Sequence, residues 1–215
     1  MNTLAIVVTA YKIDQEVIDR FFLYNEHLEN VFCVTDGNIP SHINRISCPE
    51  QEIFSIAKTA NLGIRTAINA GFDVILKTDI DCIITQSIIN HCKEMQPRMA
   101  ACWRHFNVKD PDNLDEHWQD TRCIGSAVMH AQAWDEVNGY NENMSGYGFD
   151  DGDLRFRARG KGITMPTLLK PHLYHIWHEE KHNRETINPL LRIENIAVRK
   201  KKYINPEWGK FIDIE

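Results

Sequence analysis

The sequence predicts a single α/β domain with a largely parallel central sheet. Short apolar runs rich in β-branched residues alternate with stretches of helical periodicity, which is the order of elements found in such sheets. One of these runs, residues 74–76, leads to Asp79-Ile80-Asp81, and α/β sheets bind ligands at the carboxyl ends of their buried strands. The length of 215 residues and the hydrophobic content of 43% suit one domain with a substantial core.

The first half of the chain supplies most of the alternation. Asp14 precedes a helix whose apolar residues share one broad face, and a second helix begins near Ile56 and ends at Gly71. Around these two helices we expect strands at residues 4–9, 31–35, 43–48 and 74–76.

The second half combines further elements with a predicted long loop. Residues 105–121 are rich in Asp, Asn and Pro, which indicates a loop of the kind that covers substrates. Around it we expect helices at residues 86–95, 133–137 and from 150 onward, and strands at 99–103 and 125–129.

Composition excludes several classes of protein. The formal charge of −6 argues against a broad electrostatic grip on nucleic acid. No basic segment precedes the first apolar run, and no apolar run approaches the length of a membrane span, so we expect no signal peptide and no transmembrane segment. The six cysteines contain no C-x-x-C pair, which indicates reduced thiols in a cytoplasmic protein without structural zinc.

Asp79 and Asp81 form the first candidate site. No basic residue lies between them, and two uncompensated carboxylates favour a hard cation such as Mg²⁺ or Mn²⁺. The alternative is a solvated turn, because the same Asp-x-Asp spacing occurs at residues 110–112 and 151–153. The apolar residues on both sides of Asp79 and Asp81 favour the metal site.

A segment of glycines and aromatics, residues 139–149, leads into the second candidate site. Such a segment lets backbone and ring faces approach a ligand. Asp150, Asp151 and Asp153 follow it at the start of a predicted helix, where acidic side chains also suit the helix dipole. Capping explains Asp150 and Asp153 better than Asp151, which is therefore the candidate general base.

The late histidines and the basic tail offer two further features. His175 and His178 supply imidazoles that would complete a metal site, although strand alternation separates their faces and each is also compatible with a structural role. The tail, residues 192–203, is amphipathic and ends in a basic run, which suits either an anionic membrane or polymer or a solvated helix end.

Together these segments resemble the GT-A fold nucleotide-sugar glycosyltransferases, within that fold the galactosyltransferase and chondroitin-polymerase type. The resemblance extends over about residues 4–183. It rests on four segments: a helix before the strand that leads to Asp79, the Asp-x-Asp motif itself, a Gly-aromatic-Gly block ending in two acids, and a late histidine segment. These are residues 58–64, 78–81, 125–126 with 138–154, and 175–178.

The resemblance implies a Rossmann-like three-layer sandwich, with a nucleotide-sugar half at residues 1–85, an acceptor half at 99–190 and a tail at 191–215. It implies Mn²⁺ or Mg²⁺ on Asp79, Asp81 and a histidine, with His178 favoured over His175. The donor is expected to be a UDP-sugar. The residues expected on the nucleotide side are Thr9, Tyr11, Asp36, Lys58, Asn61 and Asp79.

On the acceptor side, the resemblance implies that Asp151 deprotonates an acceptor hydroxyl while Asp150 holds the acceptor. One base opposite one leaving group predicts a single displacement with inversion. A glycan or another hydroxyl compound is the expected acceptor, and the acidic net charge argues against a modified nucleic-acid base. The chain departs from the family pattern at Asp150, where Glu is usual, and at Phe149, where a small residue is usual.

Two other classes of function remain open at this point. One is a sugar-nucleotide-binding module without transfer activity. The other is a nucleotidyltransferase-like metal enzyme, which usually carries a glycine-rich basic loop after the first strand. Residues 9–12, Thr-Ala-Tyr-Lys, do not form such a loop.

Overall fold

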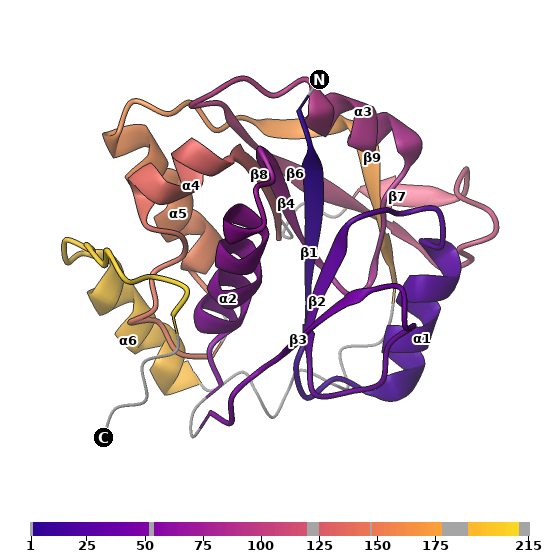
Figure 1. Ribbon diagram of the computed structural model, residues 1–215, viewed down its shortest axis with the longest axis horizontal. Helices are drawn as coiled ribbons and strands as arrows, with labels where there is room; N and C mark the ends of the chain where they lie inside the picture. Colours follow the sequence, from indigo (N-terminus) through magenta and orange to yellow (C-terminus); the bar gives the residue numbers. More distant parts are fainter. Residues whose placement is uncertain (1, 52–53, 120–124, 147, 178–188, 211–215) are drawn as a thin grey trace.

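The computed structural model describes residues 2–51, 54–119, 125–146, 148–177 and 189–210. It contains one mixed sheet between two layers of helices (Figure 1). The strands are β1 (Leu4–Ala10), β2 (Val31–Thr35), β3 (Asn44–Ser47), β4 (Val74–Asp79), β5 (Cys82–Ile83), β6 (Ala100–Val108), β7 (His117–Gln119), β8 (Ser126–His130) and β9 (Thr167–Ile176). The helices are α1 (Gln15–Tyr24), α2 (Ile56–Asn69), α3 (Gln86–Lys93), α4 (Ala131–Val137), α5 (Asp150–Gly160) and α6 (Pro189–Arg199).

The direction of the strands sets the position of the site. The order across the sheet is β3-β2-β1-β4-β8-β6-β9-β5, and β7 pairs with β6. Strands β1 to β4 are parallel, whereas β8 runs antiparallel to both β4 and β6, and β9 is parallel to β6. The carboxyl ends of β1, β2, β4, β6 and β9 therefore point the same way, as predicted for a mostly parallel sheet.

Two hydrophobic cores hold the three layers together. Helices α1 and α3 pack on one face of the sheet, where Phe21 and Ile88 lie in the same core as Trp103. Helices α2, α4 and α5 cover the other face, where Ile64 and Trp134 are fully buried (Figure 1). Burying one such side chain stabilises the fold by about 2 kcal/mol. The predicted three-layer α/β class is confirmed.

Helix α2 shows how the local sequence specifies an element of this fold. The hydroxyl of Ser55 accepts a hydrogen bond from the Lys58 amide and caps the amino terminus. At the other end, Gly71 has φ +89°, a backbone conformation that favours glycine. Between them, a side chain on Gly63 would overlap Val7 and Val34, so glycine allows the helix to lie close against β1 and β2.

The prediction of a loop over residues 105–121 is wrong at both ends. Strand β6 continues to Val108 and pairs with β9, and β7 forms a short hairpin back onto it. Apolar Phe106 and Val108 alternate with polar His105 and Asn107, and all four are buried, as in a strand covered on both faces. The Asp, Asn and Pro content belongs to the turn at residues 110–116 rather than to the whole segment.

Within the described residues, no helix is both long and apolar enough to cross a membrane. Five cysteines, residues 33, 48, 82, 92 and 102, carry free thiols, and Cys123 lies outside the described residues. Burial raises the pKa of the Cys33 thiol to about 12, which keeps it protonated and unreactive.

Candidate active site

The structure brings three of the predicted nucleotide-side residues to one edge of the sheet. Thr9 lies beside Asp79 in the register of β1 and β4, and Tyr11 follows at the end of β1. Asp36 follows β2, and its Oδ1 accepts a hydrogen bond from the Lys12 backbone amide at 3.0 Å. This contact fixes the two strand ends relative to each other, with Asp79 alongside.

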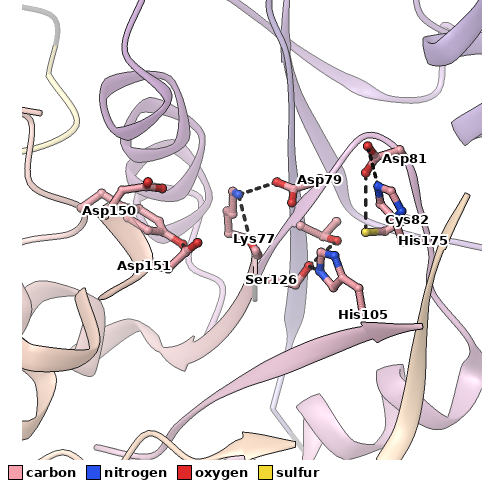
Figure 2. Close-up of polar contacts among 12 residues, drawn as sticks. Lys77, Asp79, Asp81, Cys82, His105, Ser126, Asp150, Asp151 and His175 are labelled. Carbon is pink, nitrogen blue, oxygen red and sulfur yellow. Dashed lines mark hydrogen bonds and ion pairs between the residues drawn. The ribbon is translucent and has the colours of Figure 1, made fainter. Parts of the chain in front are cut away.

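Lys77 occupies the centre of the candidate site (Figure 2). Its side chain is 3% exposed, and its Nζ lies 2.6 Å from Asp79 Oδ1 and 3.0 Å from the Gly125 carbonyl. Burial is the largest single influence and lowers the pKa of the ammonium, but Asp79, Tyr140 and Asp151 together outweigh it and raise that pKa well above its usual value. Asp79 is therefore compensated by a permanent cation, and the interpretation of two uncompensated carboxylates is wrong.

Asp81 is paired with His175 at the end of β9. Oδ2 of Asp81 lies 3.1 Å from Nε2 of His175. The other ring nitrogen, Nδ1, is 2.8 Å from Oδ1 of Asn107, an oxygen that only accepts hydrogen bonds. Nδ1 therefore carries a hydrogen, and Nε2 faces the carboxylate either as a lone pair or as a second N–H.

This arrangement fits a divalent cation. A neutral imidazole oriented by a hydrogen bond at its far nitrogen is the usual form of a metal-binding histidine. A lone pair and a carboxylate oxygen facing each other at 3.1 Å repel unless a cation or a proton lies between them. No group of three or more His, Cys, Asp or Glu side chains suited to a metal occurs in the described part of the chain, and the expected ligand His178 lies outside it.

A second imidazole, which is buried, packs against that of His175. His105 is 2% exposed and stacks on His175 with ring centroids 5.7 Å apart. Its Nε2 lies 3.3 Å from the Ser126 hydroxyl, which in turn bonds the Thr78 hydroxyl at 2.9 Å. Burial lowers the pKa of His105, so this ring is neutral and serves as packing for His175.

Asp150 and Asp151 approach from the first turn of α5, and in the view of Figure 2 they lie on the far side of Lys77 from Asp79. The Tyr140 hydroxyl donates to Asp151 Oδ1 at 3.4 Å, and the Gly148 amide donates to Asp150 Oδ1 at 3.2 Å. Burial, followed by the charge of Asp150, raises the pKa of Asp151 well above its usual value. Burial also raises the pKa of Asp150. Two neighbouring acids with raised pKa values are stronger bases than exposed carboxylates.

Phe149, the residue before these acids, has an unusual backbone. Its φ is +71°, in the left-handed region where a residue with a side chain is disfavoured. Glycine, which has no side chain, would adopt the same backbone at lower steric cost. The strained residue directly precedes Asp150 and Asp151. Backbone strain of this kind tends to occur at functional sites.

Asn61 and Lys58 do not share one environment. Asn61 is fully buried; its amide nitrogen donates to the Tyr140 carbonyl and to Glu142, and its oxygen accepts from the Tyr140 amide at 2.7 Å. These bonds occupy its polar atoms and leave no surface for a nucleotide, so its role is to hold the segment that carries Tyr140. Lys58 is exposed on α2.

Gly125 adjoins the site for a steric reason. An added Cβ would overlap Asp79 Oδ2 and lie 3.3 Å from Cε1 of His105. Glycine therefore provides the room that the Asp79 carboxylate occupies while its own carbonyl accepts from Lys77.

Sequence reasoning missed Lys77 and Asn107. Lys77 stands two residues before Asp79 in a strand, so period-two alternation already places both on one face. Asn107 was hidden by the loop prediction, because a residue in a loop has no predictable facing partner.

Comparison with known proteins agrees with this fold. Residues 104–179 match a family model described as the N-terminal domain of galactosyltransferase. No curated protein is matched in sequence. Among solved structures, the catalytic domain of Drosophila beta1,4-galactosyltransferase 7 in complex with xylobiose has a TM-score of 0.64 at 13% identity, covering 96% of this chain and 84% of that one.

Two further structures share the fold. A mutant of the same Drosophila enzyme, in complex with manganese, UDP-Gal and xylobiose, has a TM-score of 0.59 at 12% identity, covering 94% of this chain and 82% of that one. GalNAc-T7 with UDP, GalNAc and Mn²⁺ has a TM-score of 0.62 at 9% identity, covering 84% of this chain and 45% of that one. The chain therefore shares the fold of these glycosyltransferases, and residues 104–179 also match the galactosyltransferase family model in sequence.

Proposed function

We propose that the chain is a metal-dependent, inverting glycosyltransferase that moves a sugar from a UDP-type donor to an acceptor hydroxyl. The observation that carries the proposal is that two pairs of side chains lie at one site (Figure 2). Asp81 with His175 suits a cation, and Asp150 with Asp151 suits a proton acceptor, while Lys77 and Asp79 lie between them. A transferase needs both groups, one for the leaving diphosphate and one for the attacking hydroxyl.

Asp81 and His175 would hold the metal, with His178 as the further ligand that the family resemblance implies. A carboxylate and an imidazole together suit Mn²⁺ as well as Mg²⁺. When bound, such a metal neutralises the charge that develops on a diphosphate leaving group. Asp79, held by Lys77, would face the donor, with Thr9, Tyr11 and Asp36 toward its nucleoside.

Asp151 would act as the base. As the acceptor oxygen forms its bond to the anomeric carbon, the bond from that carbon to the diphosphate oxygen breaks, and the acceptor proton passes to Asp151. One displacement from the face opposite the leaving group inverts the anomeric centre. The raised pKa makes Asp151 a stronger base than an exposed carboxylate, and the Tyr140 hydroxyl orients it. Asp150 would hold the acceptor.

The relatives support the class of donor and acceptor. The Drosophila enzyme binds UDP-Gal, manganese and xylobiose, and GalNAc-T7 binds UDP, GalNAc and Mn²⁺. We therefore propose a UDP-sugar as donor and a glycan or another hydroxyl compound as acceptor. The net charge of −6 continues to disfavour a nucleic-acid acceptor.

A panel of nucleotide sugars, measured by thermal shift and by release of nucleoside diphosphate with and without Mn²⁺, tests the proposal. We expect one UDP-sugar to stabilise the protein only with metal, and Asp81→Ala to abolish that response. Asp151→Asn should still bind the donor but lose about 10²–10⁴-fold in turnover. Asp112→Ala is the matched control, because Asp112 ends the Asp-x-Asp pair at residues 110–112, in the turn after β6.

The panel also separates the alternatives. No metal-dependent response to any nucleotide sugar would contradict the transferase proposal. Donor binding with no turnover, identical in the original chain and in Asp151→Asn, would indicate a binding module.

A further inference from the structure

Helix α6 presents an apolar face to solvent. Leu190 is 66% exposed, Ile193 64% and Ile196 40%, and Ala197 is also exposed. At about 100° per residue, these four side chains fall within an arc of about 120°. A helix that packs on a protein normally buries such an arc. We name the surface formed by these four residues the α6 apolar face.

The opposite side of α6 is attached to the molecule through Asn195. Asn195 is 2% exposed. Its Nδ2 donates to the carbonyls of Ser145 at 2.9 Å and Gly148 at 3.2 Å, and its Oδ1 accepts from the Ser145 amide at 3.1 Å. The helix is thus held at Asn195, with Val198 half-buried on the same side, while the side chains of the α6 apolar face are exposed.

A run of cations adjoins the α6 apolar face. The chain has a formal charge of −6, yet residues 199–202 read Arg-Lys-Lys-Lys. The three lysines are exposed, and Ile204, 64% exposed, follows them. Glu194 is the acidic residue exposed on the helix, and it stands at the border of the apolar arc.

We propose that the α6 apolar face and the three lysines at residues 200–202 dock the protein on an anionic lipid bilayer. Aliphatic side chains enter the boundary between headgroups and acyl chains while lysines contact the lipid phosphates, which is how an interfacial helix binds. Protein partners are less suited to this surface, because their interface cores favour aromatic residues and arginine and are depleted of lysine.

Docking there would place the candidate active site beside the membrane. Ser145 and Gly148, whose carbonyls Asn195 holds, precede Asp150 and Asp151 at the start of α5. Arg199 packs against the same turn of α5, with its guanidinium within 4 Å of the Cβ position of Gly152. The docking inference stands apart from the proposed transfer reaction, because lipid binding requires neither donor nor metal.

Co-sedimentation of the full chain with phosphatidylcholine vesicles, with and without phosphatidylglycerol, tests the inference. We expect binding to the anionic vesicles only. Leu190→Ser/Ile193→Ser should weaken it at least about tenfold. Replacing the three lysines at residues 200–202 with Gln should weaken it by about a hundredfold, at about fivefold for each lysine.

Leu23→Ser is the matched control, because Leu23 on α1 is also 66% exposed and lies on the other side of the sheet. It should leave vesicle binding unchanged, and circular dichroism should show that all variants fold. Absence of binding to anionic vesicles, or equal binding by the double variant, would overturn the proposal. A concentration-dependent dimer by light scattering, lost in Leu190→Ser/Ile193→Ser, would instead assign the face to a second copy of the chain and would also overturn it.

Discussion

The Lys77 ammonium lies 2.6 Å from the Asp79 carboxylate, and its charge also acts on Asp150 and Asp151 across the site. Lys77 lowers the pKa of each of these two acids, against the effect of burial. One buried cation therefore pairs with Asp79 and also lowers the pKa of the two acids at the start of α5. Its removal should affect both sides together.

Breaking the Lys77–Asp79 pair should destabilise the fold. Lys77→Met leaves Asp79 without its cation, and because Asp79 is 34% exposed, water replaces part of the lost interaction. We expect a loss of about 2 kcal/mol in the free energy of unfolding, less than for a fully buried pair. Urea denaturation measures the loss.

A double variant completes that experiment. Lys77→Met/Asp79→Asn removes both charges, so most of the lost stability should return. If the double variant were as unstable as Lys77→Met, the loss would come from packing around the lysine stem and not from the unpaired carboxylate.

The pH dependence of transfer should report the environment of Asp151. Its base form is the charged form, which burial and then the Asp150 charge disfavour, so the rate should rise with pH through a raised pKa. Asp150→Asn removes the neighbouring charge and lowers the pKa of Asp151. The acid limb of the kcat/KM profile should then move to lower pH, and a shift to higher pH would contradict the assignment.

Gly125→Ala should impair donor binding through Asp79. The added methyl group would overlap Asp79 Oδ2, so the carboxylate must leave its position. We expect KM for the donor to rise at least about tenfold. Gly160→Ala, where no atom lies within 4 Å of the new Cβ, is the control and should leave KM unchanged.

Asn107 should position the imidazole of His175. Asn107→Ala removes the acceptor at 2.8 Å from Nδ1 and should weaken Mn²⁺ binding about 10–100-fold, measured by calorimetric titration without donor. Asn107→Asp keeps an acceptor there and should restore most of the affinity. Equal affinity in the alanine variant would show that the ring is oriented by other contacts.

Several features could be read from the sequence because they depend on residues close together in the chain. The alternation of apolar runs specifies the layers, and the fold class and the resemblance to GT-A glycosyltransferases are confirmed. Asp79 and Asp81 follow a buried strand, and Asp150 and Asp151 begin a helix, where each was predicted. Their roles in metal binding and proton transfer stay predictions.

Only the tertiary structure decided which of these groups meet. His175 reaches Asp81 and Asn107 because β9 pairs with β5 and β6, strands separated from it by dozens of residues. Asn61, which was predicted on the nucleotide side, is buried and hydrogen-bonds the backbone of Tyr140. A sequence pattern gives the face of each residue on its own strand, but the neighbour across the sheet depends on strand order and register, which long-range packing fixes.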